Sequence, residues 1–75
     1  MKDEDVTRAM IIMKYARHCR QLADIVDVML KDAHNETSLA KDDIIDIVWI
    51  LSRAKAHLTD AQSELVSQAL KSEDP

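Results

Sequence analysis

The chain has 75 residues, contains one cysteine and no glycine or phenylalanine, and carries a formal net charge of −4. A core of this size supplies only roughly 3–5 kcal/mol, so small proteins usually add disulfides, a metal ion or a second subunit. One cysteine excludes an intramolecular disulfide, and the acidic balance argues against general binding to nucleic acid. The only proline is the last residue, so nothing in the interior interrupts a helix, and the sequence predicts an all-α fold.

A first helix is expected from about residue 5 to residue 34, with Asp3 or Asp5 as its N-cap. Its apolar residues recur at intervals of three and four, which predicts packing against one neighbouring helix. This first seam consists of Ala9, Ile12, Ala16, Cys19, Ala23, Val26, Leu30 and Ala33.

A second apolar seam runs beside the first on the same expected helix. It has the same spacing and one polar member, and it consists of Ile11, Tyr15, His18, Leu22, Ile25 and Met29. A helix with two adjacent seams needs a broader groove or two partners, and the chain supplies only one other long helix. We therefore expect a second copy of the chain to cover this seam. If His18 is buried there, its protonation should weaken association below about pH 6.

Residues 35–38 are expected to form a loop, with Asn35 in a left-handed conformation and Thr37 or Ser38 capping a second helix. That helix is expected from about residue 39 to residue 71. Its predicted seam consists of Ile44, Ile47, Leu51, Ala54, Leu58, Ala61, Leu65 and Gln68.

Two readings of the second helix stay open, because Thr59 and Gln62 match a capping box. The helix either continues through Thr59, as its unbroken heptad favours, or breaks there. In both cases the short loop makes the helices antiparallel neighbours. The prediction is an all-α, antiparallel two-helix hairpin, a single domain over residues 1–75 that dimerises into a four-helix bundle.

Basic residues are concentrated in two stretches that the hairpin brings to about the same level. They predict a charged belt of Lys14, Arg17, Arg20, Arg53 and Lys55. Such a belt is typical of a solvated surface, or of a docking surface for an acidic partner, whether protein or RNA.

Trp49 is the only tryptophan, and it falls opposite the predicted seam of the second helix, one turn after Ile45. Tryptophan is a frequent anchor of protein interfaces. Three uses stay open: Trp49 and Ile45 complete the core of a homo-oligomer, they meet a foreign partner, or Trp49 merely lies on the surface.

The sequence contains no motif for catalysis, cofactor binding or metal binding. His18 and Cys19 are neighbours and point about 100° apart on a helix, so they are poorly placed to share a metal ion. There is no glycine-rich loop or nucleophile motif, and two packed helices leave little room for a pocket. We expect a non-enzymatic protein with no cofactor, metal or small-molecule substrate.

The longest apolar run, residues 44–51, contains Asp46 and is far shorter than the roughly 20 residues that span a membrane. The lone cysteine is typical of a reducing compartment. We therefore expect a cytoplasmic protein that does not enter membranes.

An antiparallel hairpin with small and large residues in heptad layers, in a chain of this length without glycine, is similar to the Rop-like plasmid copy-control proteins. The resemblance covers the architecture of residues 5–71 and no sequence motif. It implies a dimeric four-helix bundle that binds paired RNA loops, and the cluster Lys14, Arg17 and Arg20 is the feature here that suggests such a role.

The first functional hypothesis is a small regulatory protein that, as a homodimer, binds and masks another protein. Anti-activators, inhibitors carried by phages or plasmids, and small chaperones act in this way. The alternative is a Rop-like RNA-binding bundle that uses the basic belt. A third reading is a plain oligomerisation module.

Overall fold

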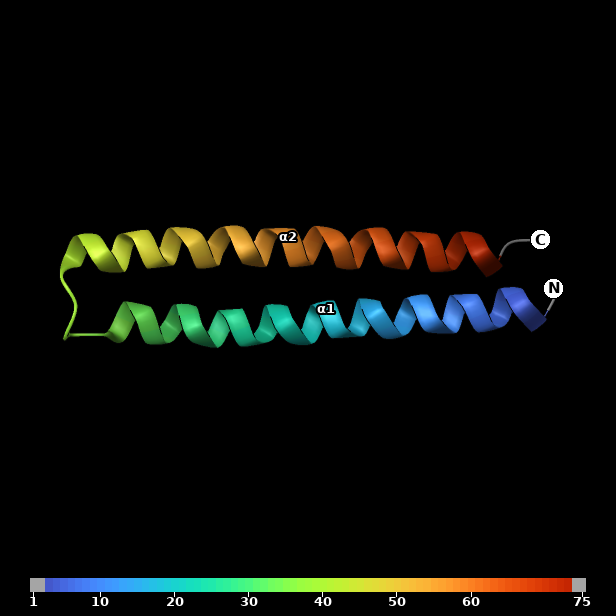
Figure 1. Ribbon diagram of the computed structural model, residues 1–75, viewed down its shortest axis with the longest axis horizontal. Helices are drawn as coiled ribbons and strands as arrows, with labels where there is room; N and C mark the ends of the chain where they lie inside the picture. Colours follow the sequence, from blue (N-terminus) through green and yellow to red (C-terminus); the bar gives the residue numbers. More distant parts are fainter. Residues whose placement is uncertain (1–2, 74–75) are drawn as a thin grey trace.

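In the computed structural model, which describes residues 3–73, the chain forms two helices of equal length, α1 (Asp3–Asn35) and α2 (Lys41–Glu73). The helices lie side by side and antiparallel, with the start of α1 beside the end of α2 and the loop at the opposite end (Figure 1). The Cα atoms extend over 56 × 13 × 11 Å. This arrangement confirms the predicted all-α helical hairpin.

Both helices begin at slightly different residues from those expected. α1 starts at Asp3, so Asp3, Glu4 and Asp5 all occupy its first turn, where the helix dipole favours acidic side chains. Asp5 is therefore not a cap. α2 starts at Lys41, and the Ile44 N–H donates to the Ala40 carbonyl at 3.1 Å.

The loop is organised by the carboxylate of Glu36. Its Oε1 atom accepts hydrogen bonds from the Ser38 N–H at 3.0 Å, the Ser38 hydroxyl at 2.7 Å and the Thr37 N–H at 3.0 Å. The two bonds from Ser38 are the main reason why the pKa of Glu36 is lowered. Thr37 and Ser38 therefore serve the loop rather than cap α2, which corrects the expectation for them.

Asn35 also differs from its prediction. It is the last residue of α1, and no residue in the described range 3–73 has a positive φ. At the end of the helix, the Glu36 N–H instead donates a hydrogen bond to the carbonyl of Ala33, three residues earlier, at 3.3 Å. No left-handed residue is needed, because this bond satisfies one of the last carbonyls of the helix.

α2 continues through Thr59 without a break. The Thr59 hydroxyl donates to the Lys55 carbonyl one turn earlier, at 2.9 Å. A threonine in this position satisfies its hydroxyl inside the helix instead of capping a new one. Of the two readings of the second helix, the continuous one is confirmed.

The first seam of α1 is its line of contact with α2. Ala9, Ala16 and Ala23 are buried, and the other members of the seam are half-buried. Alanines at every seventh position allow the helices to approach closely. Among residues 3–73 no large side chain is fully buried, so the core of a single hairpin is thin.

The line of contact on α2 agrees with the predicted seam at Ile44, Leu51, Leu58 and Leu65, but not at every position. The residues facing α1 are half-buried or buried: Ile44, Val48, Leu51, Lys55, Leu58, Gln62, Leu65 and Ala69. Ile47, Ala61 and Gln68, which were expected in the seam, are exposed, and Ala54 is half-buried. The half-buried Lys55 and Gln62 occupy the contact with their aliphatic stems. Ile47 and Ala61, which lie beside that contact, therefore remain exposed.

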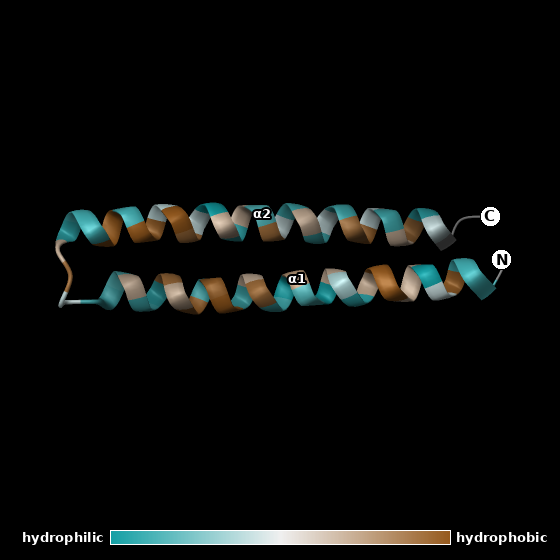
Figure 2. Cartoon of the chain, in the orientation of Figure 1, coloured by the Kyte–Doolittle hydropathy of each residue, from teal (hydrophilic) through white to brown (hydrophobic). Residues whose placement is uncertain are grey.

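Apolar residues are not confined to the facing sides of the helices, as Figure 2 shows. Within residues 3–73, fourteen large apolar side chains are exposed, among them Leu22 at 50%, Trp49 at 65% and Ile50 at 67%. Neither helix, over the part of the chain described, holds a stretch both long enough and apolar enough to cross a membrane. Such an excess of exposed apolar surface is typical of an interaction surface.

Candidate interaction surfaces

The hairpin has two flanks, one on each side of the line of contact. Positions 16, 23 and 30 of α1 and positions 48, 55 and 62 of α2 lie on the line of contact. Because the helices are antiparallel, the residues that immediately precede these positions on α1 and on α2 lie on the same flank. The residues just after positions 19 and 26, and after positions 44, 51 and 58, lie on the other flank. The ion pair between Lys55 Nζ and Asp27 Oδ1, at 2.6 Å, joins the helices on this second side.

We call the first flank the broad apolar face. It carries the whole second seam of α1 and a matching column of α2, and all its members except the half-buried Ala54 are exposed. The face consists of Ile11, Tyr15, His18, Leu22, Ile25, Met29, Ile47, Ile50, Ala54, His57 and Ala61. Five of the seven residues predicted for an interface, from Tyr15 to Met29, therefore lie together on one surface.

Large and small residues alternate across the broad apolar face. Because the two helices have 33 residues each and run antiparallel, Leu22 lies at about the level of Ala54, and Tyr15 at about the level of Ala61. A large side chain beside a small one leaves ridges and hollows into which another helix can pack. Such a surface can accept the ridges of another helix.

Two histidines occupy the middle of this face. The rings of His18 and Tyr15 meet edge to face, with centroids 6.0 Å apart and an interplanar angle of 85°. His57 lies on α2 at about the same level and is also exposed. Sequence reasoning placed both histidines beside the basic belt but assigned only His18 to an apolar seam. The signal for His57 was its place in the series Ile47, Ile50, Ala54, His57.

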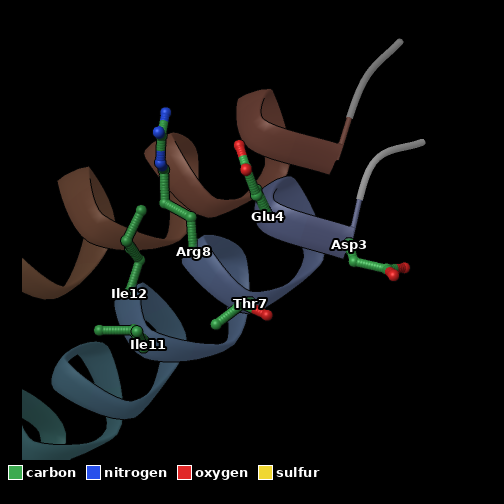
Figure 3. A pocket seen from close by; sticks show the side chains of 6 residues that line it. All are labelled: Asp3, Glu4, Thr7, Arg8, Ile11 and Ile12. Atoms are coloured by element: carbon green, nitrogen blue, oxygen red, sulfur yellow. The ribbon is translucent and has the colours of Figure 1, made fainter.

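Near the free ends, the broad apolar face continues into a shallow hollow on α1 (Figure 3). The hollow has a volume of about 500 Å³ and is lined by Asp3, Glu4, Thr7, Arg8, Ile11 and Ile12. Ile11 and Ile12 supply its apolar part, and the charged groups Asp3, Glu4 and Arg8 lie on the side towards the start of α1. Sequence reasoning did not find this extension, because Arg8 and Glu4 interrupt the apolar spacing.

We call the second flank the Trp49 face. Trp49 and Ile45, 65% and 48% exposed, lie there near the loop. Beside them is a hollow of about 410 Å³ lined by Val48, Trp49, Ser52, Arg53 and Ala56. Unlike the broad apolar face, this flank is interrupted by Arg20 and by the ion pair of Asp27 with Lys55.

The residues of the predicted basic belt are distributed around the hairpin. Arg17 and Arg20 lie on the Trp49 face, whereas Lys14 and Arg53 lie on the outer sides of α1 and α2, and all four are exposed. Lys55 is half-buried and paired with Asp27. Of these residues, Arg53 lines the Trp49 hollow, whereas Arg20 and Arg17 lie farther towards the free ends of the same flank.

In the described range 3–73, no three histidine, cysteine or acidic side chains gather in a group able to hold a metal ion. Comparisons of the chain with protein families, with curated proteins and with solved structures find no match. The two flanks therefore provide the basis for a functional proposal.

Proposed function

We propose that this protein is a non-enzymatic regulator that pairs with a second copy through its broad apolar face and binds another protein through its Trp49 face. One observation carries the proposal: the apolar stripes of both helices extend beyond their mutual contact towards the same flank. A helix with one neighbour points its stripe at that neighbour. A helix in a four-helix bundle has two neighbours and points its stripe between them.

The size of the face supports a second copy as its occupant. Two of the Cα extents, 56 and 13 Å, give a footprint of about 700 Å², close to the ~800 Å² that each partner buries in a stable complex. The alternation of Leu22 with Ala54 and of Tyr15 with Ala61 is self-complementary when α1 of one copy faces α2 of the other, because each large side chain then meets a small one. The second copy also supplies the core that a single hairpin lacks.

Light scattering at several concentrations, with absorbance at 260 nm recorded, tests the pairing. We expect nucleic-acid-free protein at about twice the 8.5 kDa chain mass. A monomer at 100 μM and above would contradict the proposal. RNA that copurifies and dissociates at high salt would favour the RNA-binding alternative.

The Trp49 face stays outside such a dimer, because it lies on the opposite flank. Tryptophan and arginine are the residue types that most often dominate binding energy, and Trp49 and Arg53 line the same hollow. The hollow suits a partner helix that offers an apolar side chain next to a carboxylate for Arg53. The flank also carries Arg17, Arg20 and the exposed Asp24. The bound segment would then be masked from its other partners.

A selection from random helical peptides tests this partner chemistry. Peptides are selected on the wild-type protein and counter-selected on Trp49→Ala. Leu70→Ala is the matched control, because Leu70 is an exposed apolar residue of α2 (59%) near the far end of the same flank. We expect selected peptides to pair an apolar residue with Asp or Glu within one turn and to bind Leu70→Ala normally. Peptides rich in Lys or Arg, or equal binding to Trp49→Ala, would refute this part of the proposal.

A further inference from the structure

The two histidines of the broad apolar face lie at the midpoints of the helices. α2 runs from residue 41 to residue 73, so His57 is its middle residue, and α1 runs from residue 3 to residue 35, so its middle residue is Cys19, next to His18. Both imidazoles are exposed in the single hairpin. Because the two helices are equally long and antiparallel, both histidines lie at about the same distance from the ends of the hairpin.

We propose that, in the paired protein, each His18 and each His57 faces an imidazole of the second copy, so that pairing is lost when the pH falls. This inference rests on the pairing proposed above. A two-fold arrangement that overlaps the full helices superimposes their midpoints whichever way the copies run. With the loops at opposite ends, His18 meets His18 and His57 meets His57. With the loops at the same end, His18 meets His57.

Protonation is unfavourable in this position for two reasons. Burial in the interface penalises the charged form of each imidazole, and two imidazolium ions facing one another repel. The nearby charges do not compensate. Lys14 and Arg53 each lie one turn before a histidine and add positive charge, Arg17 adjoins His18, and Asp60 is the single acidic side chain within one turn of either ring.

The direction of the pH dependence of association follows from this burial and these charges. The neutral imidazole is favoured in the pair, so association is strongest above the ordinary titration range of histidine, near pH 6.5, and weakens as the pH falls through it. Four imidazoles per dimer take part. We expect the dissociation constant of the pair to rise by roughly 100-fold or more between pH 8.0 and pH 5.5.

The test is sedimentation equilibrium of the full chain at pH 8.0 and pH 5.5, with circular dichroism recorded in parallel. Three proteins are compared: the wild type, the double variant His18→Gln with His57→Gln, and His34→Gln. His34 is the matched control, because it is exposed at the loop end of α1 and away from the midpoint. Both substituted positions of the double variant are exposed in the hairpin, so its fold should survive.

The expected result is a wild type and a His34→Gln variant that are dimers at pH 8.0 and dissociate at pH 5.5, and a double variant that stays dimeric at both. A wild-type dimer with the same dissociation constant at both pH values would overturn the inference and leave the pairing intact. Equal acid dissociation of the double variant would also overturn it. A wild-type monomer at pH 8.0 would refute the pairing itself, and with it the histidine contact.

Discussion

The two flanks of the hairpin differ in how continuous their apolar surface is. On the broad apolar face, residues that are apolar except for one histidine on each helix recur at every three or four positions from Ile11 to Met29 and on α2 from Ile47 to Ala61. On the Trp49 face, the exposed apolar residues near the loop are separated from those near the free ends by Arg20 and the Asp27–Lys55 ion pair. A continuous stripe suits a helix pair that runs the length of the molecule, whereas an isolated apolar site suits a short segment.

The difference shows why exposure alone does not identify an interface. Leu22 on the broad apolar face and Val28 on the outer side of α1 are 50% and 58% exposed. They differ in what surrounds them: Leu22 belongs to a stripe shared by both helices, and Val28 does not. The strongest prediction exploits this pair of residues.

Leu22→Asp should have the largest effect on association, and Val28→Asp almost none. In a dimer each Leu22→Asp places an unpaired carboxylate in the interface, at a cost of ~2 kcal/mol or more per copy. Two copies give a dissociation constant higher by roughly 1000-fold. Sedimentation equilibrium at pH 8.0 measures it. Equal weakening by both variants would mean that the broad apolar face is not the pairing surface.

Trp49→Ala should change stability by less than ~1 kcal/mol, because the side chain is 65% exposed and its loss creates no core cavity. Since Trp49 is the only tryptophan, its own fluorescence gives a second measurement. The emission maximum of the wild type should stay constant as the protein is diluted from dimer to monomer. A blue-shifted emission in the dimer, or a stability loss of roughly 3–5 kcal/mol as for a buried tryptophan, would place Trp49 in the dimer core instead.

Asp27→Ala should lower the free energy of unfolding by at most ~1 kcal/mol, and Asp24→Ala should leave it unchanged. Both side chains of the Asp27–Lys55 pair are partly exposed, 40% and 43%, and such pairs contribute little because solvent screens them. Urea unfolding at low salt and in 1 M salt measures the difference, which should disappear at high salt. A large loss that persists in salt would show that the pair, and not the alanine contact, holds the helices together.

The sequence was sufficient for the hairpin and for the line of contact on α1, because Ala9, Ala16 and Ala23 leave no doubt about which stripe packs closely. It was not sufficient for α2. There only half of the predicted seam lies in the line of contact. The half-buried Lys55 and Gln62 complete that line, while Ile47 and Ala61 remain exposed. Hydrophobic spacing shows that a stripe will be covered, but it does not show whether the chain's own second helix or another molecule covers it.

The hydrogen bonds of the loop, unlike its position, escaped prediction for a different reason. Asn35, Thr37 and Ser38 were judged by the roles that their residue types usually have at helix ends. The carboxylate of Glu36 instead takes three hydrogen bonds from two neighbours, a choice decided by local geometry. The face on which His57 lies became clear only when the contact line of α2 was known.

The smallest expected effect concerns Glu36, and it separates the loop from both flanks. Hydrogen bonds from Ser38 and Thr37 lower the pKa of Glu36. The stabilisation of the loop by the Glu36 carboxylate is therefore fully present above the ordinary pKa of a glutamate and is lost as the pH falls through the lowered pKa. Glu36→Gln removes this titration but leaves an acceptor. NMR shifts of the Thr37 and Ser38 amides should change in acid in the wild type and stay constant in the variant.

The dissociation of the proposed dimer near pH 6 should be the same in Glu36→Gln as in the wild type, because the histidines responsible lie half a helix away from the loop. If Glu36→Gln also abolished that step, the acid response would originate in the loop, and the distinction between the pairing face and the rest of the hairpin would fail.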